Sequence, residues 1–288
     1  MKKNTLALAV AASVASAITL PAQAADSFTE AFVGGKASVD FRLRNESVRQ
    51  DNALDRANAT TARLRLGYQT GEYKGFGVFV EAEHLTALGG EKYNSTVNGN
   101  RAYSVVADPE FTEINQAYLS YSGIPKTMLK YGRQRIVLDN HRFIGNVGWR
   151  QNEQTYDAFT VVNRSLPETT ITGGYIYNVN RVFSDKSAVG DFRMKSPILN
   201  VNYKGLRAGE LTGYAYLLDF ETAPANSTQT YGLRFKGAAP LDGFGKLLYT
   251  AEYATQSDRA DNPRNFNVDY YLVEGGIDES QSAALRRR

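Results

Sequence analysis

Four arginines recur at alternate positions in two short stretches, and this spacing suits the recognition of anions. Arg42 and Arg44 are separated by one apolar residue, and so are Arg63 and Arg65. In an extended chain, residues two apart point to the same side, so each pair begins a cationic row. Guanidinium groups keep their charge and present a fork of donors that fits carboxylates. The rows predict attraction of anionic solutes, unless acidic neighbours neutralise them and they only hold the structure together.

Ionisable residues of both signs occupy the corresponding positions of later stretches. The main candidates for the same polar face are Glu81, Glu83, Lys130, Arg234 and Glu252. The alternation assigns further residues to it, namely Asp40, Gln116, Asp157, Asn200, Asn202, Asp219, Lys236 and Asp269. Rows of opposite charge on adjacent strands can form ion pairs, so each residue has a structural as well as a functional interpretation.

The segment around the only Trp concentrates a second set of polar side chains. Between residues 131 and 158 the chain carries a Gly-Arg-Gln string, an Asp-Asn pair and a Gly-Trp-Arg-Gln-Asn string. The residues of this set are Arg133, Gln134, Asp139, Asn140, Arg142, Trp149, Arg150, Gln151 and Asn152. Such a mixture is unusual for a loop that faces only water. Arg133 also falls on the apolar face of its stretch, which predicts a bulge there or a position above the membrane.

Enzymatic chemistry has little support in the sequence. The chain has no Cys and only two His, which excludes disulfides and thiol chemistry. The adjacent pair Asn140 and His141 could serve a hydrolase, but neither Gly-x-Ser-x-Gly nor His-Glu-x-x-His is present. Asp258 and Asp261 could hold Ca²⁺, although a solvated turn is the simpler interpretation. We therefore expect no enzymatic activity, no catalytic residue, no cofactor and no metal site.

The elements that must position these residues are β-strands, because apolar and polar residues alternate with period two. Mean hydropathy of −0.39 is too polar for a bundle of membrane helices, and 42% hydrophobic residues are too many for a disordered chain. The predicted strands span 36–48, 60–70, 75–86, 111–122, 127–135, 154–164, 169–180, 197–204, 208–221, 228–236, 245–256 and 266–274.

The connections between these strands alternate in length, which is typical of an up-and-down barrel in an outer membrane. Short connections such as 71–74 and 123–126 carry turn residues, whereas long ones such as 87–110 are rich in Asn, Asp and Ser and predict solvated loops. The 33 aromatic residues include many Tyr near strand ends, as in membrane girdles. We predict an all-β, antiparallel up-and-down transmembrane barrel of about 12 strands. A soluble barrel with its apolar face inward is the alternative.

The N-terminus predicts export from the cytoplasm. Two lysines precede an apolar stretch from residue 6 to residue 20, and Ala22-Gln23-Ala24 suits a signal peptidase. Residues 1–24 are predicted as a signal peptide, with a single membrane anchor as the alternative, and residues 25–276 as the barrel domain. Without the two lysines, 31 basic residues face 30 acidic ones, so no nucleic acid partner is expected. The predicted location is the outer membrane of a Gram-negative cell.

The motifs between residues 112 and 158 resemble those of the alginate export family of outer-membrane barrels, and the resemblance extends from about residue 36 to 274. It implies a monomeric porin-like barrel with more strands than are counted here. In the alginate-secreting member an Arg-rich lumen conducts the polyuronate. The Trp-containing set would then fold into the lumen as a constriction, or form an ordered outer cap. The partners implied are outer-membrane lipid, the barrel-assembly machinery during insertion, and an anionic small solute or polysaccharide.

The chain departs from that family at its C-terminal end. After residue 276 the alternation is lost, so residues 277–288 are predicted as an irregular tail, and the usual terminal aromatic strand is missing. We expect an incomplete larger barrel with two unpaired edges. The expected function is a pore for passive passage of anionic solutes through an Arg-lined lumen, with an anionic polysaccharide such as alginate as a candidate solute. The alternatives are a non-conducting barrel that acts as a structural or binding platform, and an outer-membrane hydrolase.

Overall fold

The computed structural model describes residues 6–16, 25–241 and 245–279, and this part of the chain is almost entirely β-structure. One short helix, α1 (Phe28–Val33), precedes the second strand, and a 3₁₀ turn covers Pro224–Asn226. The strands are β1 (Leu6–Ser16), β2 (Lys36–Arg49), β3 (Ala57–Gln69), β4 (Phe76–Ala87), β5 (Phe111–Tyr121), β6 (Thr127–Gln134), β7 (Thr155–Asn163), β8 (Thr169–Asn180), β9 (Asp191–Leu206), β10 (Gly209–Leu218), β11 (Thr228–Leu241), β12 (Gly245–Asp258) and β13 (Asn267–Asp278).

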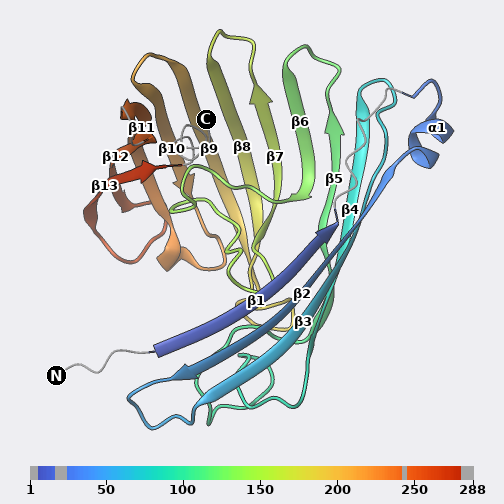
Figure 1. Ribbon diagram of the computed structural model, residues 1–288, viewed down its shortest axis with the longest axis vertical. Coiled ribbons are helices and arrows are strands. Elements are labelled where there is room, and N and C mark those ends of the chain that lie inside the picture. Colours follow the sequence, from blue (N-terminus) through green and yellow to red (C-terminus); the bar gives the residue numbers. More distant parts are fainter. Residues whose placement is uncertain (1–5, 17–24, 242–244, 280–288) are drawn as a thin grey trace, which may run out of the picture. The chain divides into compact units, whose positions relative to one another are not determined.

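Each strand pairs with the next strand along the chain, in the order β1 to β13 (Figure 1). The registers between consecutive strands are antiparallel, for example in β2 with β3 and in β11 with β12. This confirms the predicted up-and-down sheet, and the twelve predicted strands correspond to β2–β13. The largest difference is at β9, which begins at Asp191 rather than at 197. There Phe192 and Met194 are buried between charged residues, and two apolar positions were too few to indicate a strand.

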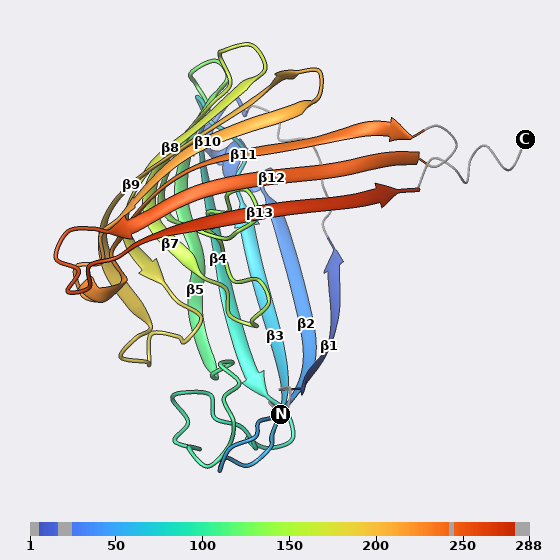
Figure 2. The same ribbon diagram turned by 90° about the vertical axis from the view of Figure 1, so that its left-hand side faces the viewer.

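The chain divides into two compact units, and each is described here by itself. Unit 1 comprises residues 1–123, 130–158 and 177–192, and unit 2 comprises residues 124–129, 159–176 and 193–288. Unit 1 contains β1–β5 and the long loops that follow β4 and β6 (Figure 2).

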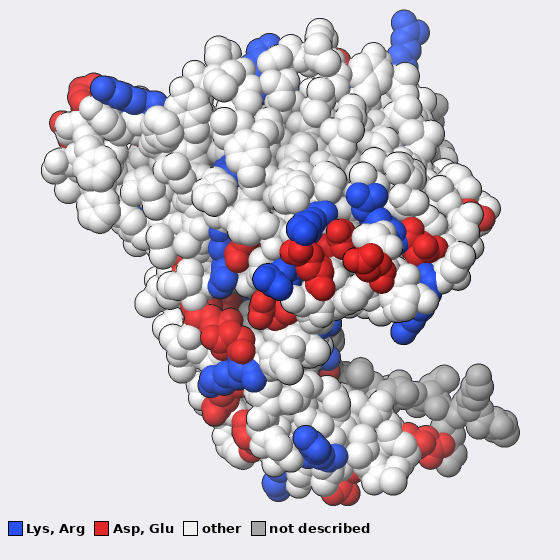
Figure 3. Space-filling view, turned by 180° about the vertical axis from the view of Figure 1, so that it is seen from behind, with Lys and Arg blue, Asp and Glu red and all other residues white. Residues whose placement is uncertain are grey.

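On most strands of both units the buried face is mainly polar and the exposed face is mainly apolar, with β9 as an exception at Phe192 and Met194. In unit 1, Phe41 is 44% exposed, whereas Arg44 and Glu83 are each 1% exposed. In unit 2, Leu233 is 52% exposed and Glu252 is buried. The charged groups seen in Figure 3 accordingly gather in mixed patches, and wide stretches of that face carry no charge. This orientation confirms the transmembrane interpretation and contradicts a soluble barrel, because a water-facing wall would be polar outside.

The loop between β4 and β5 is packed, which corrects the prediction of a solvated connection. Tyr93 and Val106 from this loop are fully buried against Val48, Ala57 and Ala59 on β2 and β3. The Tyr93 hydroxyl donates to the backbone carbonyl of residue 108 over 3.1 Å. The small alanines on the strands leave room for the ring, and the loop thereby forms an apolar cluster on an otherwise polar face.

Helix α1 begins at a cap that the sequence analysis did not identify. The Ser27 hydroxyl accepts from the Glu30 amide over 3.1 Å, and the Gly71 amide in the turn after β3 donates to the Ala31 carbonyl over 2.8 Å. The helix is therefore fixed against the short-turn end of β3. Among the described residues, no helix is both long enough and apolar enough to cross a membrane.

The two ends of the chain relate to the predicted domains as follows. Residues 6–16, inside the predicted signal peptide, form β1 and pair with β2. Residues 1–5 and 17–24, which include the predicted cleavage motif, lie outside the described residues. Strand β13 extends to Asp278, two residues into the predicted irregular tail, and residues 280–288 again lie outside the described part. Strand β2 pairs with β1 on one side and with β3 on the other.

Candidate functional site

The candidate site of unit 1 begins with the two arginine rows, which β2 and β3 bring together. Arg42 is directly opposite Arg63 in the sheet register. Arg44, Arg63 and Arg65 are nearly fully buried, and Arg42 is half-buried. Like charges in directly opposed positions destabilise a sheet unless other groups compensate them. The compensation here comes from the loop after β6 and from acidic side chains.

Backbone carbonyls of the loop between β6 and β7 accept from the arginines. Arg42 donates to the carbonyls of Gly148, Trp149 and Arg150 over 3.1 to 3.2 Å. Arg44 donates to the Trp149 carbonyl over 2.6 Å, and its guanidinium carbon lies 4.5 Å from the centre of the Trp149 ring. Arginine can satisfy several carbonyls at once because it has five donors in a planar fork. The loop therefore folds back onto β2 and β3, as expected for a constriction (the yellow-green segment in Figure 2).

Gln151 fixes the tip of this loop to the strands. Its side chain is fully buried, and Nε2 donates to the Thr61 hydroxyl over 2.9 Å and to the Thr61 carbonyl over 3.1 Å. Its backbone amide donates to Asp108 Oδ1 over 3.1 Å, and its carbonyl accepts from Arg63 over 3.0 Å. With these bonds the loop replaces water at the buried wall, where unsatisfied polar groups would be costly.

Carboxylates neutralise most of the arginines. Arg63 pairs with Asp40, and Arg65 pairs with Glu83. Glu46 pairs with Arg44 and also accepts from Arg150 over 3.1 Å. Within the described part of the chain, Arg42 forms no ion pair. The same is true of Lys130 on β6, which lies 4.4 Å from the ring centre of Tyr118. Among the described residues, these two cations therefore have no carboxylate in direct ion-pair contact.

Glu153 joins the loop to three elements of unit 1. It lies 3.2 Å from Arg65, forms an ion pair with Arg135, and accepts from Asn115 and Asn146 over 2.7 Å each. Its burial disfavours the charged form, but the hydrogen bond from Arg135 and the charge of Arg65 outweigh burial and lower the pKa of Glu153 to about 2. Glu153 is thus an ionised anchor at neutral pH.

A bulge in β5 supplies further polar groups to this face. Ala82 pairs with Ile114 and Glu81 with Gln116, so Asn115 is an extra residue without a partner in the register. Because of the bulge, both amides donate to Glu81, Asn115 over 2.6 Å and Gln116 over 3.1 Å. Two successive residues of one strand therefore point to the same side, which simple alternation does not allow.

Of the remaining predicted loop residues, two are buried and three are exposed. Gln134 is buried and donates to the Ala158 carbonyl over 2.9 Å, and buried Asn152 donates to the Arg181 carbonyl over 3.4 Å. Asp139, Asn140 and Arg142 are exposed in the loop between β6 and β7. Next to them, His141 is also exposed.

Asp157 corrects one prediction, and Arg133 is its partner. Arg133 lies in β6, inside the predicted strand 127–135, and it pairs with Asp157 over 2.8 Å. Asp157 was predicted on the polar face. In β7 its neighbours Tyr156 and Ala158 are buried, so Asp157 points to the opposite face of the strand. Gly132, with φ of 125°, is a backbone irregularity directly before Arg133. The pair is therefore part of the wall and not of the constriction.

In unit 2 the predicted pair of Arg234 and Glu252 is a structural contact. Arg234 Nη1 donates to Glu252 over 2.9 Å, and the Tyr214 hydroxyl donates to the same carboxylate over 2.6 Å. Asp269 was predicted on this polar face, but its register partner is Thr255 and it accepts from Tyr253, which is 47% exposed. That prediction was wrong because β13 carries apolar residues on both faces.

Several residues of the site were not predicted. Glu46 continues the alternation of Arg42 and Arg44, and Glu153 directly follows the Gly-Trp-Arg-Gln-Asn string. The sequence pattern could therefore have identified both as site residues. Asn115 precedes a predicted residue, but its inward position requires the bulge. Asp108 had no signal, since it lies in an aperiodic loop.

Comparisons with known proteins agree with this architecture. Residues 34–267 match the family described as alginate export. No curated protein matches the chain by sequence. Among solved structures, Acinetobacter baumannii OccAB3 has a TM-score of 0.66 at 18% identity, with 86% of this chain and 64% of that chain covered. Pseudomonas aeruginosa OpdK, solved with vanillate, has a TM-score of 0.63 at 14% identity and the same coverage.

The comparisons also confirm the expected class and location. The strands match part of an outer-membrane channel barrel, and the chain spans about 64% of the length of OccAB3 and of OpdK. The matched region covers every strand from β2 to β12. Both findings indicate an outer-membrane porin fold. This chain belongs to the alginate export family of outer-membrane β-barrel proteins.

Proposed function

We propose that the protein is an outer-membrane channel for passive passage of carboxylate-bearing solutes, and that Arg42 and Lys130 are its selectivity residues. The observation that carries this proposal is the absence of an ion pair at both cations among the described residues. Arg44, Arg63 and Arg65, in contrast, each form an ion pair. A charge with a close counterion exerts only a weak field at a distance, so the two unpaired cations dominate the attraction of anions.

The surroundings of Arg42 support this role. Its three hydrogen bonds go to neutral carbonyls, which orient the guanidinium without cancelling its charge. A carboxylate that reaches the loop can accept from a guanidinium in place of a carbonyl and gains a charge-assisted hydrogen bond.

The substrate class follows from the same contacts. The family description names alginate, a polymer of uronic acids, and the related OpdK was solved with vanillate, a small aromatic carboxylate. The shared chemistry is a carboxylate on a ring. Trp149 is 55% exposed, and its ring stacks beside Arg44, so a ring-bearing anion finds a stacking surface next to a cation. We therefore propose a uronate saccharide or a small aromatic acid as the solute.

A non-conducting platform is the second candidate, and the density of the loop contacts favours it. The arginines bind the loop so extensively that they could serve only to hold it against the strands. The two functions differ in one measurement, namely whether the purified protein conducts ions in a planar bilayer.

The experiment measures the reversal potential under a KCl gradient in planar bilayers. We expect anion preference in the wild-type protein and a smaller preference in Arg42→Gln and Lys130→Gln, with the lowest value in the double variant. The matched control is Arg207→Gln, since Arg207 is exposed in the turn after β9, and its reversal potential should equal that of the wild type. An unchanged reversal potential in the double variant would refute the assignment of these residues. Absence of any current would support the platform.

A further inference from the structure

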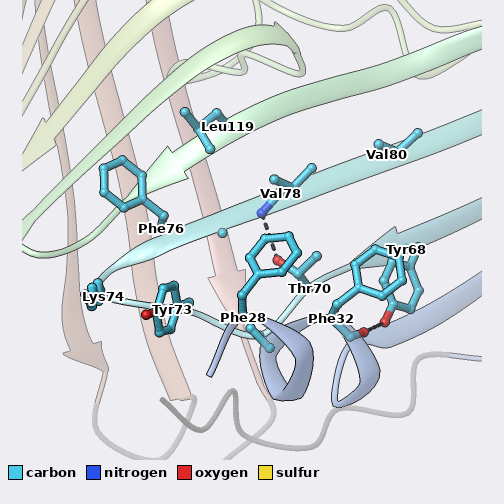
Figure 4. A pocket seen from close by; sticks show the side chains of 13 residues that line it. Phe28, Phe32, Tyr68, Thr70, Tyr73, Lys74, Phe76, Val78, Val80 and Leu119 are labelled. Atoms are coloured by element: carbon cyan, nitrogen blue, oxygen red, sulfur yellow. Dashed lines mark hydrogen bonds between the residues drawn. The ribbon is translucent and has the colours of Figure 1, made fainter. Parts of the chain in front are cut away.

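An apolar cavity of about 490 Å³ opens on the outer side of unit 1, beside helix α1. Figure 4 shows Phe28 and Phe32 of the helix directed toward the outward residues of β4, among them Val78 and Val80. Leu119 on β5 completes the far wall. Cavities of this size, in the range of ~300–1,000 Å³, hold small ligands in many proteins.

Hydrogen bonds join helix α1 to β3 and to the turn after β3, and the cavity lies between the helix and β4. The Tyr68 hydroxyl donates to the Phe32 carbonyl, and the Gly71 amide donates to the Ala31 carbonyl over 2.8 Å. Both contacts join the helix to β3 and its turn. Phe28 and Phe32 nevertheless remain 72% and 57% exposed. Two large aromatic rings would be unfavourable in water at this exposure, so their surroundings must be apolar.

The cavity is continuous with the face that meets the membrane. Val78 and Val80 are each 41% exposed and alternate with the buried residues of β4. The cavity lies at the short turns, which face the periplasm in outer-membrane barrels. An apolar recess at this depth adjoins the inner, phospholipid leaflet of the membrane.

Lys74 lines the cavity at the turn between β3 and β4. Lys74 is exposed, has φ of 51°, and lies with its ammonium 5.3 Å from the Tyr73 ring centre. The nearby Glu72 carboxylate accepts from the Ser122 hydroxyl over 2.6 Å. Lysine at the membrane interface is complementary to lipid phosphate.

We propose that this cavity binds one acyl chain of a phospholipid of the periplasmic leaflet, with the phosphate beside Lys74. The aromatic rings of α1 and the valines of β4 enclose the chain, and the lipid fills space that protein side chains leave empty. The bound phospholipid would then fix α1 to the wall. This site lies on the outer face and does not depend on conduction through the lumen.

The test measures phospholipid that stays bound to the full-length protein. The protein is reconstituted with dioleoylphosphatidylglycerol, transferred to a maltoside detergent and analysed by native mass spectrometry. We expect a single retained phospholipid in the wild type and its loss in Val78→Trp, which fills the cavity. The control is Val39→Trp, because Val39 is 49% exposed on the same face but does not line the cavity. Its retained lipid should equal that of the wild type.

Lys74→Gln tests the headgroup contact and cannot disturb packing, because Lys74 is exposed. We expect less retained phosphatidylglycerol in this variant than in the wild type. No retained lipid in the wild type, or equal retention in Val78→Trp and Val39→Trp, would overturn the proposal. Unchanged retention in Lys74→Gln would overturn the assignment of the phosphate.

Discussion

Glu153→Gln should release the loop between β6 and β7 from the arginine cluster. The Glu153 carboxylate is 2% exposed and interacts with Arg65, Arg135, Asn115 and Asn146. The substitution keeps the shape but removes the charge, so Arg135 loses its ion-pair partner. Removal of one partner from a buried pair costs about 3 to 5 kcal/mol, and we expect about 3 kcal/mol because the amide still accepts a hydrogen bond. This lowers the ratio of docked to undocked loop by about 100-fold.

Two assays report this change. Trypsin cleavage after Arg150 should be about 100-fold faster in the variant, because Arg150 is protected in the docked loop by its contact with Glu46. Single-channel current in planar bilayers should become larger and noisier. The control is Asp51→Asn, which removes a carboxylate from an exposed loop and should change stability by less than about 0.5 kcal/mol. Equal cleavage rates in Glu153→Gln and the wild type would show that Glu153 does not hold the loop.

Two further predictions concern the same unit. The pKa of Glu153 is lowered from its ordinary value of 4.5 to about 2, so its stabilisation is fully present above about pH 4.5 and is lost as the pH falls from there through about 2. Arg150 should therefore be as well protected from a protease at about pH 5.5 as it is at pH 7, and exposure of the loop already at about pH 5.5 would contradict this pKa. Tyr93→Ala should destabilise the loop after β4 by about 3 to 5 kcal/mol because the ring is fully buried, which hydrogen exchange of residues 88–110 can measure, and exchange as slow as in the wild type would contradict the packing of this loop.

The strands could be predicted from the sequence because the membrane imposes the same alternation on all of them. Strand β8 has the predicted bounds, Thr169–Asn180, and the exposure of Phe41 and burial of Arg44 follow the predicted faces. The assignment of side chains to faces failed where a strand carries apolar residues on both faces. In β13, Tyr270 and Tyr271 are adjacent aromatic residues, so the alternation does not show which face meets lipid, and Asp269 was assigned to the wrong face.

The loops could be predicted only where the family resemblance reached them. Trp149, Arg150 and Gln151 were expected to fold into the lumen as a constriction, and this stays a prediction; their backbone carbonyls accept from arginines of β2 and β3. Tyr93 was not, because its contacts are to β2 and β3 and a loop has no periodicity that indicates a distant partner. The bulge at Asn115 depends on which residue leaves the register, and no local residue preference determines that.

The carbonyls of residues 148–151 act as a fixed hydration shell for Arg42, Arg44 and Arg63. A solute that displaces this segment must itself bring oxygen acceptors, or three desolvated cations remain. Oxygen-rich anions meet that requirement and hydrocarbons do not. In the channel proposed above, the segment would therefore discriminate between solutes by ligand exchange, independently of the width of the passage.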